Sequence, residues 1–142
     1  MKFKPERGRI LIVNFEMGGR VPPEITKPGR PCVVLQNNSI RGTGRLLVVP
    51  LSTVEPKNVF PYHHKMDHRS FRGSPLEARQ PCWALADCVT LVSYDRCKDP
   101  HIPEKYTTKR RYQKLMAIKS DIDAIEKCLL WALAIDPAKH SA

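Results

Sequence analysis

The sequence predicts a mainly β protein, with a small, strongly bent antiparallel sheet or barrel and one C-terminal helix. Three observations predict this fold class. The 142 residues suffice for one sizeable core, apolar residues come in short runs between turn formers, and 13 prolines spread along almost the whole chain argue against a helical bundle. We expect one domain over residues 1–142, with a barrel core at about 8–118 and the helix at about 120–135.

Short apolar and mostly β-branched runs identify the expected strands. They lie at residues 9–15, 31–36, 45–51 and 82–93. A weaker run at 59–66 is confined to a sheet edge by Pro61, because proline cannot donate a ladder hydrogen bond. Residues 82–93 give the strongest signal. Their apolar groups on both faces predict a central strand covered on both sides, in which Asp87 is the anomaly.

The last part of the chain holds one ambiguous segment and one helix. Residues 106–118 are consistent with either a basic helix or a last strand. For the helix at 120–135, Ser120 is the expected N-cap and Asp123 stands at the capping-box position. The apolar side chains repeat every three or four residues, at Ile122, Ile125, Leu129 and Leu133. We expect this face to lie on the sheet.

Charge is the outlier of the composition, since 24 Lys and Arg against 14 Asp and Glu leave a net charge of +10. Such a surplus favours nucleic acid, an anionic membrane or an acidic protein as partner. No apolar run reaches the ~18 residues of a membrane span and no secretory signal is evident, so we expect no membrane association. Five cysteines, an odd number, suit a reducing compartment, and we expect a cytoplasmic protein. No GxGxxG or P-loop motif supports dinucleotide or NTP chemistry.

Four segments, taken in order, carry a resemblance to a known family. They are residues 8–15, which begin Gly-Arg-Ile, 29–35, which begin Gly-Arg-Pro, 48–53, which end Pro-Leu-Ser-Thr, and 84–87, Ala-Leu-Ala-Asp. With these segments the sequence resembles the MazF/PemK toxins of bacterial toxin–antitoxin pairs. The resemblance covers roughly the first 96 residues and returns in the final helix.

The resemblance implies an SH3-like small antiparallel barrel of the CcdB/MazF type and a homodimer. It also implies a sequence-specific, metal-independent endoribonuclease, an mRNA interferase that needs no cofactor, cleaves single-stranded RNA and is neutralised by a cognate antitoxin. Two other function classes stay open: a non-catalytic toxin of the same fold that poisons gyrase, and a basic nucleic-acid-binding barrel with a regulatory role.

RNA carries its own nucleophile, the 2′-hydroxyl, so a protein must supply in-line geometry, proton transfer and stabilisation of phosphate charge. Arg30, between Gly29 and Pro31, has a guanidinium fork that can grip two phosphate oxygens. Ser52 and Thr53 follow the third strand and can orient the reacting oxygens. The family pattern usually has Thr where Ser52 stands, and we prefer Ser52 of the two.

The proton acceptor is open between Asp87 and a histidine. A buried carboxylate is more often a paired structural group than a catalytic base, whereas the resemblance implies that some members use this acid at the RNA site. Some relatives have an arginine two residues before the acid and a customary glutamine after it, where this sequence has Leu85 and Cys88. The catalytic candidates are therefore Arg30, Ser52, Thr53 and Asp87.

Basic residues gather in the early loops and again before the final helix. With an acidic loop residue and two histidines they make up the RNA-contact candidates Glu24, Lys27, Arg41, Arg45, His63, His64, Lys109 and Arg110. A charge run is more often a solvated face, and the cluster before the helix suits an acidic antitoxin segment equally well. We expect His63 and His64 to alternate across an edge strand, toward solvent or RNA. With His68, Asp67 and Cys82 they form no recognised zinc-ligand set, so we expect no metal.

Overall fold

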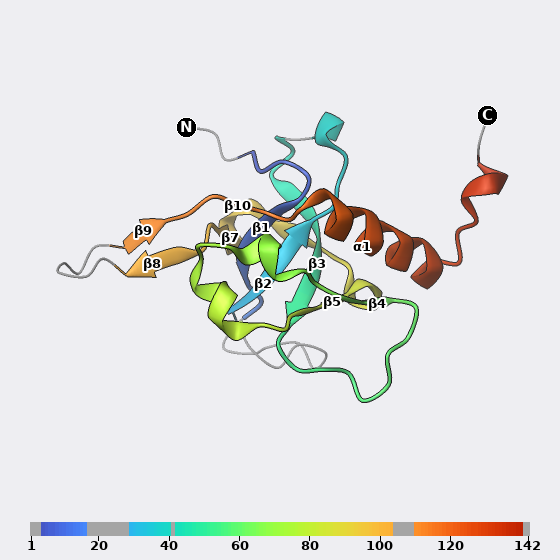
Figure 1. The fold of residues 1–142 in the computed structure, drawn as a ribbon. Coiled ribbons are helices and arrows are strands. Elements are labelled where there is room, and N and C mark those ends of the chain that lie inside the picture. The colour runs from blue at the N-terminus through green and yellow to red at the C-terminus, as the bar shows by residue number, and fades with distance from the viewer. Residues whose placement is uncertain (1–3, 17–28, 41, 104–109, 141–142) are drawn as a thin grey trace.

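The computed structural model describes residues 4–16, 29–40, 42–103 and 110–140. Figure 1 shows a bent antiparallel sheet with one long helix on one side and a two-stranded hairpin projecting on the other. The strands are β1 (Arg9–Asn14), β2 (Gly29–Val34), β3 (Arg45–Ser52), β4 (His63–Lys65), β5 (Trp83–Leu85), β6 (Thr90–Ser93), β7 (Cys97–Lys98), β8 (His101–Pro103), β9 (Arg110–Tyr112) and β10 (Leu115–Met116). The long helix is α1 (Lys119–Ala132), and the short 3₁₀ turns include η2 (His68–Phe71), η3 (Pro75–Arg79) and η4 (Ala86–Cys88).

Eight of the described strands form one sheet in the order β10-β1-β2-β3-β5-β4, with β6 paired to β3 and β7 paired to β1. Two strands change partner along their length. β3 pairs with β6 at its start and β5 at its end, and β1 pairs with β10 and then β7. Within the described chain no strand joins β4 to β10, so the sheet is barrel-like without being closed. The fold is mainly β with a C-terminal helix, as predicted.

The three central strands β1, β2 and β3 are buried on both faces. On β2, Val33 packs into one core, whereas Cys32 and Val34 pack into the other. The first core includes Phe71 and Ile125, so it lies between the sheet and the η2 and α1 segments. The second core is completed by residues of β6 and β7. This two-sided burial is why these strands appear in the sequence as continuous apolar runs.

The long central strand predicted around Asp87 is instead two strands, β5 and β6, separated by η4. Three steps along β3, from Leu51 to Val48, face six steps along its partner, residues 84–90. The three extra residues lie next to Pro50, which has no N–H to donate to a neighbouring strand. Asp87 therefore lies exposed in a turn, and the prediction of an acid in a central strand is wrong.

Helix α1 begins before Ser120 and ends before residue 135. Its N-cap is Ile118, which makes no side-chain capping bond, so the predicted capping box is wrong. The cause is Asp121, which sits in the first turn and is drawn into a buried hydrogen-bond network. The apolar face packs on the first core as expected at Ile122, Ile125 and Leu129. Leu133 lies past the helix end and is 53% exposed.

The two weaker sequence signals resolve as short strands. The segment before the helix forms β9 and β10 from residue 110 onward, which favours the strand alternative, while residues 106–109 lie outside the described residues. The run at 59–66 contributes only β4, which ends the strand order as expected for an edge strand beside Pro61. Among the described helices, none has the length and apolar character needed to cross a membrane.

Candidate active site

Arg30 is fixed at the start of β2 by pairing with β1, two residues before the ladder between β2 and β3 begins. Val13 of β1 faces it on one side. On the other side Cys32 faces Pro50 of β3, and extending that antiparallel register by two residues brings Arg30 opposite Ser52 on the same face. Arg30 is only 8% exposed. The guanidinium group is therefore held in the fold and shielded from most of the solvent.

Arg30, Ser52 and Thr53 line one small cleft with a cavity volume of about 60 Å³. The other lining residues are Gly29, Pro31, Leu51, Val54, Leu76 and Arg79. None of these described residues is acidic, so the charged groups of the cleft are cationic and favour a phosphate or another anion. The structure thus brings three of the four catalytic candidates together, and their roles in catalysis remain predictions.

The Ser52 hydroxyl is oriented by the turn that ends β3. Its Oγ accepts a hydrogen bond of 3.1 Å from the backbone N–H of Val54, a common use of serine in turns. A hydroxyl that accepts one such bond still has its own proton to donate. Ser52 can therefore hold the turn and donate a hydrogen bond to an oxygen in the cleft at the same time.

Arg79 is a cleft residue that the sequence analysis missed. It is the last residue of η3 and its side chain is exposed. The segment that carries it, residues 67–81, is rich in Arg, Ser, Gly and Pro and has neither strand nor helix periodicity. Composition alone indicated a basic loop, but it does not specify which arginine of the loop turns toward β2.

A larger cavity adjoins the cleft, and we refer to it as the side pocket. Its volume is about 330 Å³, and its lining residues are Ile12, Gly29, Pro31, Pro75, Leu76, Arg79, Pro100 and His101. Four of them, Gly29, Pro31, Leu76 and Arg79, also line the cleft, so the two cavities share a wall. A third cavity of about 430 Å³ also touches Gly29, but its lining combines Glu16 and Asp95 with Arg96 and Lys98, so it lacks the purely cationic charge of the cleft.

An ion-pair network anchors the chain that leads to His101. The Arg9 guanidinium donates to both carboxylate oxygens of Asp99, at 2.9 and 2.7 Å, and to Glu6 at 2.8 Å. Lys114 Nζ adds a hydrogen bond of 2.9 Å to Glu6. Burial opposes the ionisation of Glu6, but the hydrogen bonds from Arg9 and Lys114 outweigh it and lower the pKa of Glu6 to about 2. The network therefore stays charged at neutral pH and holds the connection from β7 to β8 against β1.

Asp87 lies outside both the cleft and the side pocket. It is exposed on η4, and its carboxylate accepts a weak hydrogen bond of 3.7 Å from the Cys88 thiol. The insertion beside Pro50 moves this part of the chain out of the ladder on β3. The structure therefore does not bring Asp87 to Arg30.

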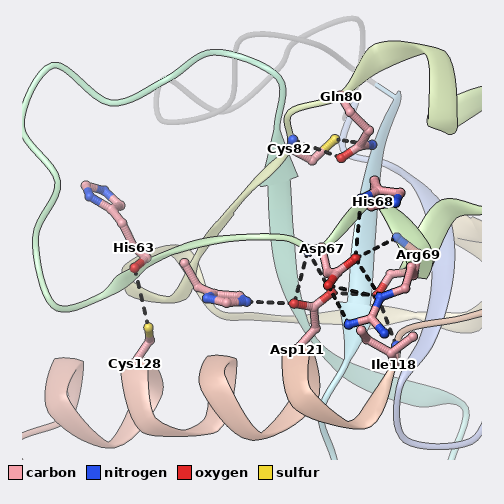
Figure 2. Close-up of polar contacts among 11 residues, drawn as sticks. His63, Asp67, His68, Arg69, Gln80, Cys82, Ile118, Asp121 and Cys128 are labelled. Carbon is pink, nitrogen blue, oxygen red and sulfur yellow. Dashed lines mark hydrogen bonds and ion pairs between the residues drawn. The ribbon is translucent and has the colours of Figure 1, made fainter.

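His64 of β4 contacts Asp121 of α1, and Figure 2 shows the polar network around Asp121. His64 Nε2 lies 2.8 Å from Asp121 Oδ1. Asp121 is 2% exposed and also accepts hydrogen bonds from the Asp67 N–H, at 3.0 Å, and from Ser70 Oγ, at 2.6 Å. Ser70 Oγ in turn accepts from the Ile118 N–H at 3.0 Å. The expectation that His64 points to solvent or RNA is wrong, because a buried carboxylate needs its donors.

His63 lies in an aromatic cluster beside α1. Its Nδ1 accepts a 3.0 Å hydrogen bond from the Phe60 N–H, and its ring centroid is 4.4 Å from that of Tyr62. Its carbonyl accepts a bond of 3.6 Å from the Cys128 thiol (Figure 2). Of the other RNA-contact candidates, Arg45 is exposed at the start of β3 and Arg110 belongs to β9. The remaining candidates lie outside the described residues: Glu24, Lys27, Arg41 and Lys109.

Metal-ligand groups and reactive cysteine thiols are the remaining candidates for chemistry in the described part of the chain. No group of three His, Cys, Asp or Glu residues there could hold a metal ion. The five cysteines are free thiols. Burial raises the pKa of the Cys97 thiol to about 11 and raises the pKa of Cys32 well above its usual range. Both thiols are therefore protonated at neutral pH and are poor nucleophiles.

The bent antiparallel sheet, the C-terminal helix and the cationic cleft at adjacent strand ends define a small barrel-like protein with a candidate anion site. Residues 6–126 match the model of a protein family described as the PemK-like, MazF-like toxins of type II toxin–antitoxin systems. The match spans most of the chain, and the protein belongs to this family. No curated protein matches the sequence significantly.

Solved structures share the fold at low sequence identity. MazF from Deinococcus radiodurans matches with a TM-score of 0.64 at 18% identity, over 94% of this chain and 99% of that one. The MazE–MazF complex from the same organism matches at 0.60 and 16%, over 94% and 99%. An endoribonuclease from Mycobacterial species in complex with its cognate antitoxin matches at 0.61 and 17%, over 93% and 97%. At these identities the similarity establishes the fold.

Proposed function

We propose that this family member is a sequence-specific, metal-independent endoribonuclease that cleaves single-stranded mRNA. The cleft carries the proposal. A buried guanidinium, a turn-held hydroxyl and a second guanidinium line it, with no acid among the described lining residues. Such a lining suits the phosphate of a nucleic acid backbone. The endoribonuclease named among the solved structures of the same fold adds support.

In the proposed reaction the RNA 2′-oxygen attacks the adjacent phosphorus. The 2′-O–P bond forms as the P–O5′ bond breaks in line, the 2′-hydroxyl loses its proton to a base, and the 5′-oxygen takes up a proton. The products are a 2′,3′-cyclic phosphate and a 5′-hydroxyl. Because the nucleophile belongs to the substrate, neither a metal nor a cofactor enters a step.

Each cleft residue has a role that follows from its chemistry. Arg30 donates to two non-bridging phosphate oxygens, on which negative charge grows in the transition state. Ser52 and Thr53 orient the reacting oxygens. Arg30 does not transfer the proton, because a guanidinium with a pKa above about 12 is a poor acid or base. Asp87 is assigned no part in the reaction, because it does not line the cleft.

The partners follow from charge and from the family. A net charge of +10 suits both a single-stranded RNA and an acidic antitoxin segment. Two of the similar solved structures are toxins bound to their antitoxins. We infer a cognate antitoxin and a homodimer for this protein, and a cytoplasmic location that fits its free thiols.

The test is cleavage of a long, poorly structured RNA in the presence of EDTA, with the fragment ends mapped and their phosphates identified. We expect defined cuts with cyclic phosphate ends from the wild type and no cuts from Arg30→Ala. Arg72→Ala is the matched control, because Arg72 is an exposed arginine that does not line the cleft. No cleavage by the wild type, or equal cleavage by Arg30→Ala with a native melting curve, contradicts the proposal. Growth arrest without RNA cleavage would favour a toxin that acts by binding alone.

A further inference from the structure

The side pocket is built differently from the cleft that it adjoins. Its walls are largely rigid and apolar, formed by Pro31, Pro75, Pro100 and Leu76. Two residues with planar polar side chains complete the lining, His101 and Arg79, and none of the described lining residues is acidic. The volume of about 330 Å³ falls within the size range of small-molecule sites, roughly 300–1,000 Å³.

We propose that the side pocket binds the nucleobase of the nucleotide next to the scissile phosphate. The proposal rests on the proposed function, because the cleft that it adjoins is assigned there to the phosphate. Flat apolar walls with a histidine and an arginine plane are the surroundings on which unstacked bases stack. A phosphate alone would gain nothing from the apolar proline walls. A base joined to a phosphate in the cleft uses both cavities.

Arg79 connects the two cavities. It lines the cleft together with Arg30 and lines the side pocket together with His101. From this place one guanidinium can donate to a phosphate oxygen with its N–H groups and cover a base with its planar face. Because the two subsites share a wall, the bound base must belong to a nucleotide that is joined directly to the phosphate in the cleft.

His101 is held in place before any ligand binds. Asp99, two residues before His101, is fixed by two hydrogen bonds of the ion-pair network. The carbonyl of Pro100 accepts a 2.7 Å hydrogen bond from the Gln113 N–H. The Tyr112 ring faces His101 across the hairpin, 6.3 Å away at 64°. A ring already held in this way loses little freedom on stacking, so more of the stacking energy contributes to binding.

The first experiment compares His101→Ala with His101→Phe, which removes the titratable group but keeps an aromatic ring. Cut sites of each variant are mapped on a long RNA, and the base preference at each flanking position is counted. We expect His101→Ala to relax the preference at one position beside the cut by about tenfold, the order of one lost base stack. His101→Phe should restore it. His68→Ala, at a side chain that is 71% exposed, is the control.

The second experiment measures the affinity of each variant for an RNA with a 2′-deoxynucleotide at the mapped cut site, which cannot be cleaved; if no site is cut, a pool of fully 2′-deoxy single strands replaces it. We expect His101→Ala to bind about tenfold more weakly and His101→Phe to bind like the wild type. If His101→Ala binds as tightly as the wild type and keeps its base preference, the proposal that the side pocket binds a base is refuted. This holds even if the RNA is cleaved and cleavage depends on Arg30. Loss of activity in His101→Phe with an altered pH profile assigns His101 to proton transfer and also refutes that proposal. If the wild type does not cleave, the binding comparison alone decides.

Discussion

Asp121→Ala removes an acceptor that three parts of the fold share. The carboxylate takes hydrogen bonds from His64 of β4, from the Asp67 N–H that precedes η2 and from the Ser70 hydroxyl within η2. Because Asp121 belongs to the first turn of α1, it joins the helix to the sheet edge and to the loop at once. Alanine removes the acceptor of all three donors at a site where the Asp121 side chain is only 3% exposed, whereas the His64 side chain, 23% exposed, keeps some access to water.

The expected loss of stability follows from those donors. A hydrogen bond to a charged acceptor contributes about 1.5–3 kcal/mol, and a buried donor left without a partner costs about 1–3 kcal/mol. The desolvation of the carboxylate is relieved at the same time, and this offsets part of the loss. We expect Asp121→Ala to lower the free energy of unfolding by about 3–5 kcal/mol, the range for breaking one side of a buried pair.

The assay is urea unfolding of Asp121→Ala beside Asp123→Ala. Asp123 lies two residues on in the same helix, and its ion pair with Lys119 at 3.0 Å is exposed. An exposed pair of this spacing contributes about 0.3–0.5 kcal/mol, so the two variants should differ clearly. Similar losses below about 1 kcal/mol in both variants would refute the reasoning. RNA cleavage by the remaining folded Asp121→Ala should be normal, because the network lies outside the cleft.

The other predictions concern the site, pH and a glycine. Arg30→Lys keeps the charge but loses the fork, and we expect cleavage to fall by about 10²–10³-fold in a single-turnover assay; a rate near that of the wild type would contradict a bidentate grip. Glu6 has its folded pKa lowered from 4.5 to about 2, so its contribution to stability is present above pH 4.5 and is lost as the pH falls toward 2. The urea midpoint should decline over that window, and less so in Glu6→Gln. Gly8 has a φ of +92°, and a Cβ there would lie 2.6 Å from Ile122 Cδ1. Gly8→Ala should therefore lower the stability of the fold by about 1–3 kcal/mol. The loss should exceed that of Gly44→Ala, where φ is +85° but no atom lies within 4 Å of the added Cβ. Thermal melting of the two variants tests this difference.

Strand ends could be predicted from the sequence because apolar runs mark them. Arg30 stands at the start of one such run and Ser52 at the end of the next, and antiparallel neighbours place those ends side by side. The same reasoning found the apolar face of α1, since Ile125 and its neighbours repeat with the helical period. The core and half of the cleft therefore follow from local pattern.

What the sequence did not predict depends on contacts between distant segments. Pro50 interrupts the pairing of the strand beside it, and this moves Asp87 out of the ladder although nothing near Asp87 in the sequence indicates a turn. An acidic residue such as Asp121 in the first turn of a helix is locally favourable on its own, whereas its actual partners come from residues more than 50 positions away. Arg79 and His101 reach the cavities from segments without periodicity. Periodicity and turn signals describe neighbouring residues only, so they do not predict contacts between segments that are distant in the sequence.

Strand β2 is buried on both faces, so substitutions in it are expected to be tolerated less well than substitutions at the surface residues Arg79 and His101. From Cys32 to Val34 the side chains of β2 alternate between the two cores, so a substitution in this strand disturbs the packing that supports Arg30. The residues that we assign to base selection stand on a 3₁₀ turn and on a hairpin outside the main sheet. Base preference should then change through single substitutions at Arg79 and His101 that leave Leu76 in the first core and the Asp99 anchor in place, whereas the proposed phosphate grip of Arg30 is tied to the buried strand β2.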